Sequence, residues 1–142
     1  MKAIILAAGK GLRMRPLTLK TPKPLLKVKG KAIIDYVLES LPNEITEIII
    51  VIKYRGNQIR MHVGETYRGK EVSYVVGSDR GNVYSFLATK KYLKNERFLL
   101  IYGDEIPNPV NVKKCLSFIL QGMLLRSFKR RALLFLAIIL RA

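Results

Sequence analysis

The sequence predicts an α/β fold: a doubly wound, mostly parallel sheet with helices on both faces. Four short segments are apolar throughout, which is typical of strands that are covered on both faces. Segments with helical spacing separate them, so the predicted order is βαβαβαβ. The 142 residues suffice for one domain with a core, and the apolar fraction of 49% excludes a disordered polar chain.

The first half of the chain predicts two strands, a long loop and a helix. The first strand is the apolar run Lys2–Ala8. The segment Gly9–Pro24 is a loop because its two glycines, three prolines and five basic residues show no apolar periodicity. Apolar spacing predicts a helix over Lys31–Leu41, which Pro42 ends. The β-branched run Glu47–Ile52 is the second strand.

The second half repeats this alternation. It predicts a short helix over Gly56–Val63, a strand over Glu71–Val76 and a turn-rich loop over Gly77–Asn82. A helix over Val83–Leu93 and a strand over Arg97–Tyr102 follow. Three apolar side chains of this helix are expected to face the sheet: Val83, Phe86 and Leu87.

Three loops follow predicted strands and therefore meet at one edge of a parallel sheet, where ligands bind in such folds. They are Gly9–Pro24, Gly77–Asn82 and Gly103–Glu105. Glycines at 9 and 11 allow backbone N–H groups to approach an anion closely, although a surface turn with solvated lysines would have the same spacing. The loop contains neither the dinucleotide-binding fingerprint nor a P-loop.

The charge balance indicates anionic partners. Lys and Arg total 26 against 10 for Asp and Glu, a net charge of +16. No recognised nucleic-acid motif occurs, so nucleic acid is not an expected partner. Cys115 is the one cysteine, which excludes an intrachain disulfide and predicts a reducing, cytoplasmic location. No apolar run reaches the ~18 residues that a membrane span requires.

The strings Leu6–Arg13, Arg15–Thr18, Thr21–Leu26 and Gly30–Lys31 closely resemble the opening of the sugar-phosphate nucleotidyltransferases. The resemblance is specific over the first forty residues and continues more weakly to Glu105. These enzymes join a nucleoside triphosphate to a sugar 1-phosphate and release pyrophosphate. The resemblance therefore implies a Rossmann-like nucleotidyltransferase half-domain whose partners are a nucleoside triphosphate and a phosphate ester.

The resemblance also implies roles for residues of the first loop. Arg13 would bind the triphosphate and stabilise the leaving pyrophosphate, and Lys23 would lie beside the α-phosphate and the incoming sugar phosphate. Both roles make physical sense, because one anion attacks another and cations must reduce their repulsion. The residues implied to hold the nucleotide are Leu6, Ala7, Ala8, Gly9 and Gly11.

Asp104 follows the fourth predicted strand at the ligand-binding edge. A single carboxylate there suits Mg²⁺, which keeps several waters and takes substrate phosphates as ligands. Capping of the next turn is the alternative interpretation. The resemblance favours the metal, because the family's Gly-Asp pair at this point binds Mg²⁺. We assign no role to Glu105.

The second loop differs from the Gly-Thr-rich turn that is usual in the family. The run Arg80–Ser85 looks more like the cytidylyltransferase relatives that act on phosphocholine or inositol phosphate. Gly81 would allow close approach of the base, and Asn82 would form a hydrogen bond to it. The alternative is that Asn82 caps the following helix. The nucleotide and the acceptor both remain open.

The composition changes near the C-terminus. Residues 1–121, which end in a predicted amphipathic helix over Val110–Gln121, form the expected nucleotide-binding domain. Residues 122–142 contain no acid, with a basic cluster before the apolar block Ala132–Leu140. The tail is a truncated or out-of-frame end, an interfacial membrane element or a final core segment, and we favour the first.

We expect the apolar block of the tail to pack on the sheet or against another chain, as in a homo-oligomer, because it would otherwise be exposed. Family members continue past this length and supply a second metal carboxylate, whereas no acid follows Glu105 here.

The predicted function is transfer of a nucleotidyl group from NTP–Mg²⁺ to a sugar 1-phosphate. The alternatives are a cytidylyltransferase acting on a phosphoalcohol, an inactive nucleotide-binding module, and a basic protein that binds nucleic acid or anionic lipid.

Overall fold

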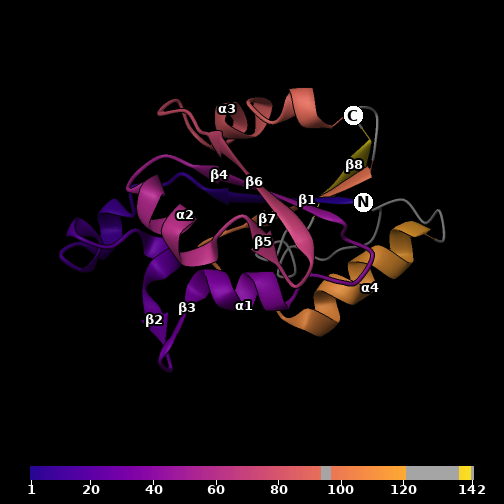
Figure 1. Cartoon of the computed structure of the whole chain (residues 1–142), viewed down its shortest axis with the longest axis horizontal. Coiled ribbons are helices and arrows are strands. Elements are labelled where there is room, and N and C mark those ends of the chain that lie inside the picture. Colours follow the sequence, from indigo (N-terminus) through magenta and orange to yellow (C-terminus); the bar gives the residue numbers. More distant parts are fainter. Residues whose placement is uncertain (94–96, 121–137, 142) are drawn as a thin grey trace.

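The computed structural model describes residues 1–93, 97–120 and 138–141. In this part of the chain, the main sheet has the strand order β5-β6-β4-β1-β7-β8 (Figure 1). The four central strands are parallel, and the two edge strands are antiparallel to their neighbours. The central strands are β1 (Lys2–Ala7), β4 (Glu47–Ile52), β6 (Lys70–Val76) and β7 (Arg97–Tyr102). The edge strands are β5 (Thr66–Tyr67) and β8 (Ile138–Arg141).

Helices cover both faces of this sheet, which confirms the predicted doubly wound architecture (Figure 1). One face is covered by α1 (Ile33–Glu39), α2 (Gly56–Val63) and α4 (Pro109–Leu120). The other face carries α3 (Asn82–Leu87) and the 3₁₀ turn Lys90–Tyr92. A small hairpin of β2 (Lys27–Val28) and β3 (Lys31–Ala32) lies apart from the main sheet. The first two residues of the helix predicted over Lys31–Leu41 therefore belong to β3, and the helix begins at Ile33.

The two apolar cores follow from the alternation of side chains along each buried strand. Ala3 and Ile5 of β1 belong to the core beneath α1 and α2, whereas Ile4 and Leu6 belong to the core beneath α3. Every residue of β1 is buried, as predicted for a central parallel strand. The cores therefore fix β1 in the middle of the sheet, with the first loop starting at its carboxyl end.

The prediction for the helix after the second loop was wrong in its length and in its inward face. The α-helix ends at Leu87, and Val83 and Leu87 are 69% and 50% exposed. Phe86 packs on the core as expected, but Ser85 turns inward and is 2% exposed. The Ser85 hydroxyl accepts a hydrogen bond from the Ser78 N–H at 3.0 Å. This satisfied polar contact sets the rotation of the helix against the apolar pattern.

Gly77, at the end of β6, lies too close to β1 to carry a side chain. A Cβ built there would be 2.7 Å from the Ala8 Cβ and 3.1 Å from Val51 Cγ1. We expect Gly77→Ala to destabilise the protein by about 1–3 kcal/mol, as an overpacked core does, measured by urea unfolding. Gly9→Ala is the matched control, because nothing lies within 4 Å of its Cβ. Equal stability of the two variants would contradict this close packing.

The C-terminal apolar block is only partly described. Its last residues belong to β8, which pairs antiparallel with β7 in a register that matches Ile139 with Leu99. This pairing places that part of the block at the edge of the sheet, beside β7. The rest of the block and the basic cluster before it lie outside the described residues, and the division into residues 1–121 and 122–142 stays a prediction. None of the described helices is long and apolar enough to cross a membrane.

Candidate functional site

A cavity of about 370 Å³ opens at the carboxyl ends of the parallel strands. Backbone and side chains from β1, the first loop, α3 and the end of β7 line it together. The lining residues are Leu6, Ala7, Gly9, Gly11, Arg13, Lys23, Pro24, Asn82, Tyr102, Asp104 and Glu105. The structure thus brings every residue singled out in the sequence to one cavity, except Ala8 and Gly81.

Ala8 and Gly81 lie just outside the lining. Ala8 packs on the core beneath α3, where it approaches Gly77, so its side chain belongs to the core. Gly81 has a φ of +112° and is the N-cap residue of α3, a conformation that favours glycine. The alternative interpretation of Asn82 as the cap is therefore wrong, because Asn82 is the first helical residue and lines the cavity.

Lys23 and Asp104 meet at the centre of the site although 81 positions separate them in the sequence. The Lys23 ammonium donates to Asp104 Oδ2 at 2.7 Å, and both side chains are partly buried. Lys23 begins a short 3₁₀ turn between two prolines, and Asp104 follows the buried strand β7. Among the described residues, the carboxylate pairs with Lys23 instead of capping its own turn. A cation and a carboxylate therefore share one wall of the cavity.

Glu105 lies beside Asp104 in the lining and was not assigned a role from the sequence. Partial burial raises the pKa of its carboxyl, the charge of Asp104 adds to this, and Lys23 opposes it. Two adjacent carboxylates offer the oxygen ligands that a hard divalent cation prefers. Within the described residues, no group of three His, Cys, Asp or Glu side chains could hold a metal. An ion bound here would need further ligands from water or substrate oxygens, which suits Mg²⁺.

The raised pKa of Glu105 has a consequence for stability. At a pH below the pKa of the Glu105 carboxyl in the unfolded protein, this carboxyl is protonated in both the folded and the unfolded state. As the pH rises, its ionisation costs more free energy in the folded state, so the folded protein loses stability. We therefore expect Glu105→Gln to raise the unfolding temperature relative to wild type at pH 7 but not at pH 3.5. Glu71→Gln is the control. It changes an exposed carboxylate near the start of β6, at the end of the sheet away from the cavity. A gain that does not depend on pH would contradict the expectation.

The first loop is held from within by Thr18. This residue is 1% exposed, and its hydroxyl donates to the Gly11 carbonyl oxygen at 2.8 Å. Gly11 has a φ of +62°, and a Cβ there would lie 2.9 Å from Thr18 Cγ2. Glycine is therefore required at position 11 by both its backbone conformation and its neighbour.

The loop is also held from outside by residues just before and within α2 that the sequence analysis missed. Tyr54 Oη donates to the Thr18 carbonyl at 2.9 Å, and Arg55 Nη2 donates to the Leu19 carbonyl at 2.7 Å. The Gln58 amide donates to the Lys20 carbonyl at 3.1 Å. All three donors bind backbone carbonyl oxygens, which every residue has. The side chains of the loop therefore give no sequence signal that predicts these contacts.

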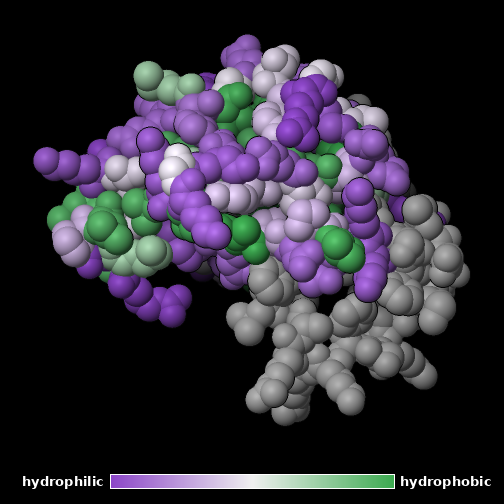
Figure 2. Space-filling view, turned by 90° about the horizontal axis from the view of Figure 1, so that it is seen from below, coloured by the Kyte–Doolittle hydropathy of each residue, from purple (hydrophilic) through white to green (hydrophobic). Residues whose placement is uncertain are grey.

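The outer side of the first loop is apolar. Figure 2 shows green side chains gathered at the end of the molecule that this loop forms, among hydrophilic neighbours. The exposed apolar side chains of the loop are Leu12, Leu17 and Leu19. Within the cavity, Tyr102 and Pro24 add an apolar wall that was not predicted. The cavity thus combines apolar surface for a planar group with cations for an anionic group.

Comparisons with known proteins agree with this geometry. The family model described as nucleotidyl transferase matches residues 2–119. A UTP–glucose-1-phosphate uridylyltransferase from Haloferax volcanii is 35% identical over 109 residues, which are 76% of this chain and 45% of that protein. A choline-phosphate cytidylyltransferase from Streptococcus pneumoniae is 42% identical over 96 residues, 67% of this chain and 42% of that protein.

Solved structures give the same result for the fold. One described as a glucose-1-phosphate thymidylyltransferase from Bacillus anthracis, in complex with sucrose, has a TM-score of 0.76 and 28% identity, and the match covers 85% of this chain and 51% of that one. A UDP-glucose pyrophosphorylase with bound UDP-glucose shares the fold, with a TM-score of 0.74 at 22% identity over 85% and 53% of the two chains. The chain thus spans about half the length of these proteins or less.

Proposed function

Because the chain belongs to the nucleotidyl transferase family, we propose that it binds a nucleoside triphosphate and transfers the nucleotidyl group to a sugar 1-phosphate. An oxygen of the acceptor phosphate attacks the α-phosphorus, the bond to the β-phosphate breaks, and pyrophosphate leaves. Both substrates are anions, so the protein must supply positive charge and fixed positions more than covalent chemistry.

The observation that carries the proposal is the convergence of Arg13, Lys23 and Asp104 on one cavity beside two glycines. Gly9 and Gly11 line the cavity, and glycines allow backbone N–H groups to approach phosphate oxygens closely. Arg13 would make a bidentate contact to the triphosphate, and Lys23 would act as a point charge between the reacting phosphates. The apolar wall and Asn82 would hold the base.

A divalent metal ion is the cofactor that we propose, and Mg²⁺ is the ion that fits the carboxylates. Asp104 would hold it, with Glu105 beside it, and the ion would neutralise phosphate charge during the transfer. Lys23 Nζ lies 2.7 Å from Asp104 Oδ2, so an ion bound at Asp104 would share this carboxylate with Lys23 or displace its ammonium.

A second candidate function is cytidylyl transfer to a phosphoalcohol such as phosphocholine. It is favoured by the second loop and by the identity of 42% to the choline-phosphate cytidylyltransferase, which exceeds the 35% to the uridylyltransferase. In this alternative, the same cavity binds CTP and the acceptor carries no sugar ring.

A matrix of pyrophosphate-release assays tests both candidates. Each nucleoside triphosphate is combined with glucose 1-phosphate, N-acetylglucosamine 1-phosphate, phosphocholine or inositol phosphate, with Mg²⁺ present. Release with a sugar 1-phosphate supports the first candidate, and release only with CTP and a phosphoalcohol supports the second. If calorimetry showed binding of a triphosphate but no pyrophosphate were released, the chain would be an inactive nucleotide-binding module. Binding that ignores the nucleotide and weakens steeply with salt would favour the basic-protein alternative.

Two further predictions accompany this proposal: a cytoplasmic location and self-association through the C-terminal apolar segment. Sedimentation of the full chain at several concentrations tests the second prediction, because self-association would appear as an average mass that rises with concentration.

A further inference from the structure

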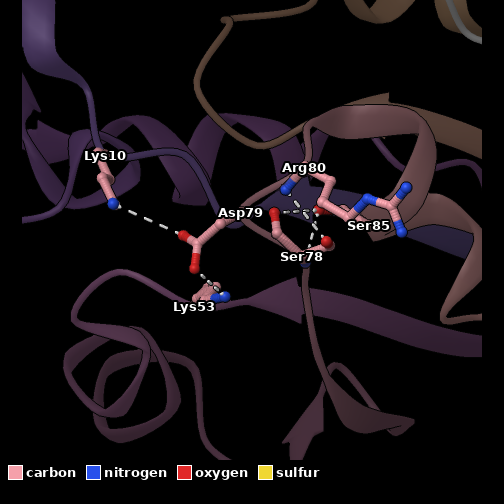
Figure 3. Close-up of polar contacts among 6 residues, drawn as sticks. All are labelled: Lys10, Lys53, Ser78, Asp79, Arg80 and Ser85. Carbon is pink, nitrogen blue, oxygen red and sulfur yellow. Dashed lines mark hydrogen bonds and ion pairs between the residues drawn. The ribbon is translucent and has the colours of Figure 1, made fainter.

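The carboxylate of Asp79 bridges two lysines from different parts of the fold (Figure 3). Lys53 Nζ lies 2.6 Å from Asp79 Oδ2, and Lys10 Nζ lies 3.6 Å from Asp79 Oδ1. Lys10 stands between the two glycines of the first loop, and Lys53 directly follows β4. One side chain of the second loop therefore connects that loop to both the first loop and the central sheet.

Hydrogen bonds hold the second loop to the sheet and to α3. The Gly77 N–H donates to the Ile52 carbonyl at 2.9 Å, and the Ser78 N–H donates to Ser85 Oγ. Figure 3 shows Ser78 and Ser85 joined beside Asp79. The Arg80 N–H donates to Ser78 Oγ at 3.1 Å. These contacts tie Asp79 to the start of α3, whose first residue lines the cavity.

Neither Asp79 nor its two lysines line the cavity. The hydrogen bond from Lys53, with the charges of Lys53 and Lys10, lowers the pKa of the Asp79 carboxyl, so this group is ionised at neutral pH. Exposed ion pairs are usually weak. Here, however, one carboxylate joins a lysine of the first loop to a lysine at the end of β4, so we expect its effect to be on geometry.

We propose that Asp79 is a positioning residue for nucleotide binding, which sets the separation between the glycine loop and Asn82. The inference rests on the proposed function, because it concerns the same cavity. Through Lys10 it restrains the backbone of the first loop, and through Lys53 it holds the second loop to the sheet. The class of ligand that benefits is a nucleoside triphosphate, which must contact both loops at once.

The test compares Asp79→Asn with wild type in two measurements. Hydrogen exchange without nucleotide should become faster in both loops, at residues 9–15 and 77–82. Calorimetry with the preferred triphosphate and Mg²⁺ should show roughly 3- to 10-fold weaker binding, the loss expected for two exposed pairs. The KM for this triphosphate should rise by the same factor, whereas kcat at saturation should change less than about 2-fold.

Four more variants separate positioning from charge. Glu71→Gln changes the net charge equally at the far end of β6 and should bind like wild type. Asp79→Glu keeps the charge and should recover most of the affinity. Lys53→Gln removes one of the two pairs and should weaken binding less than Asp79→Asn. The double variant should bind no worse than Asp79→Asn, because that substitution already removes the pair with Lys53.

The outcomes are decisive in either direction. Unchanged hydrogen exchange, equal affinity, or tighter binding in Asp79→Asn would overturn the inference, because the loss of a negative charge alone predicts tighter binding of an anion. If wild type binds no triphosphate, the proposed function fails. The hydrogen-exchange comparison then still decides whether Asp79 holds the two loops.

Discussion

Replacing Asp104 with asparagine is expected to lower the rate of pyrophosphate release by roughly 100-fold or more, the scale seen when a group that stabilises developing charge is lost. Asparagine has nearly the same shape and its carbonyl oxygen still accepts a hydrogen bond from Lys23, so the wall of the cavity is kept. What disappears is the negative charge that would hold a divalent cation. The partly exposed pair with Lys23 contributes little to folding, so the unfolding temperature should change little.

The measurement includes a readout that does not depend on turnover. Binding of Mn²⁺ to the protein, followed by electron paramagnetic resonance in the presence of a triphosphate, should weaken at least tenfold in Asp104→Asn. Glu105→Gln is the adjacent comparison and should weaken Mn²⁺ binding less, because the carboxylate of Asp104 remains. If Asp104→Asn bound Mn²⁺ and turned over like wild type, Asp104 would have no metal role.

The strands were predictable because their signal is local. Glu47–Ile52 and Arg97–Tyr102 form β4 and β7 with the predicted bounds, since a run of apolar, β-rich residues between turn residues requires no distant partner to be recognised. Once the strands are parallel, topology alone places the loops that follow them at one edge. The meeting of Arg13 and Asp104 in one cavity was predictable for this reason.

The rotation of α3 was not predictable from its apolar spacing. Val83 and Leu87 fit an inward stripe, but the buried residues are Ser85 within α3 and Thr89 just after its end. Each hydroxyl finds a backbone partner nearby: Ser85 at Ser78 and Thr89 at the Phe86 carbonyl. A polar side chain with a local partner is buried at little cost, and the existence of that partner depends on the folded loop.

The contacts that hold the site together were also beyond the sequence. Tyr54 and Arg55 bind carbonyl oxygens of the first loop, and every residue has a carbonyl. Asp79 finds Lys53 across 26 positions, in a chain whose 26 basic residues leave the choice of partner open. The chemistry of the cavity could thus be predicted from motifs, whereas the scaffold that positions it required the three-dimensional structure.

Replacing Arg13 with alanine is expected to lower kcat/KM for the nucleoside triphosphate about 100-fold. Arg13 lines the cavity, and across the described ranges its guanidinium takes part in no ion pair or hydrogen bond. Its donors are therefore available to a ligand, and hydrogen bonds to charged groups contribute about 1.5–3 kcal/mol each. A bidentate contact to phosphate of this strength accounts for the predicted loss. The same argument predicts almost no effect on stability, because the side chain is exposed.

The chain offers a close control in Arg15→Ala. Arg15 is exposed in the same loop but does not line the cavity. Its substitution by alanine therefore removes the same charge without removing a cavity residue. If net charge were what attracts the triphosphate, both variants would lose affinity equally and the loss would shrink as salt rises. If the guanidinium of Arg13 contacts the phosphates directly, the loss is confined to Arg13→Ala and persists at high salt. Lysine at position 13 should recover only part of the rate, because it supplies a point charge without the planar pair of donors.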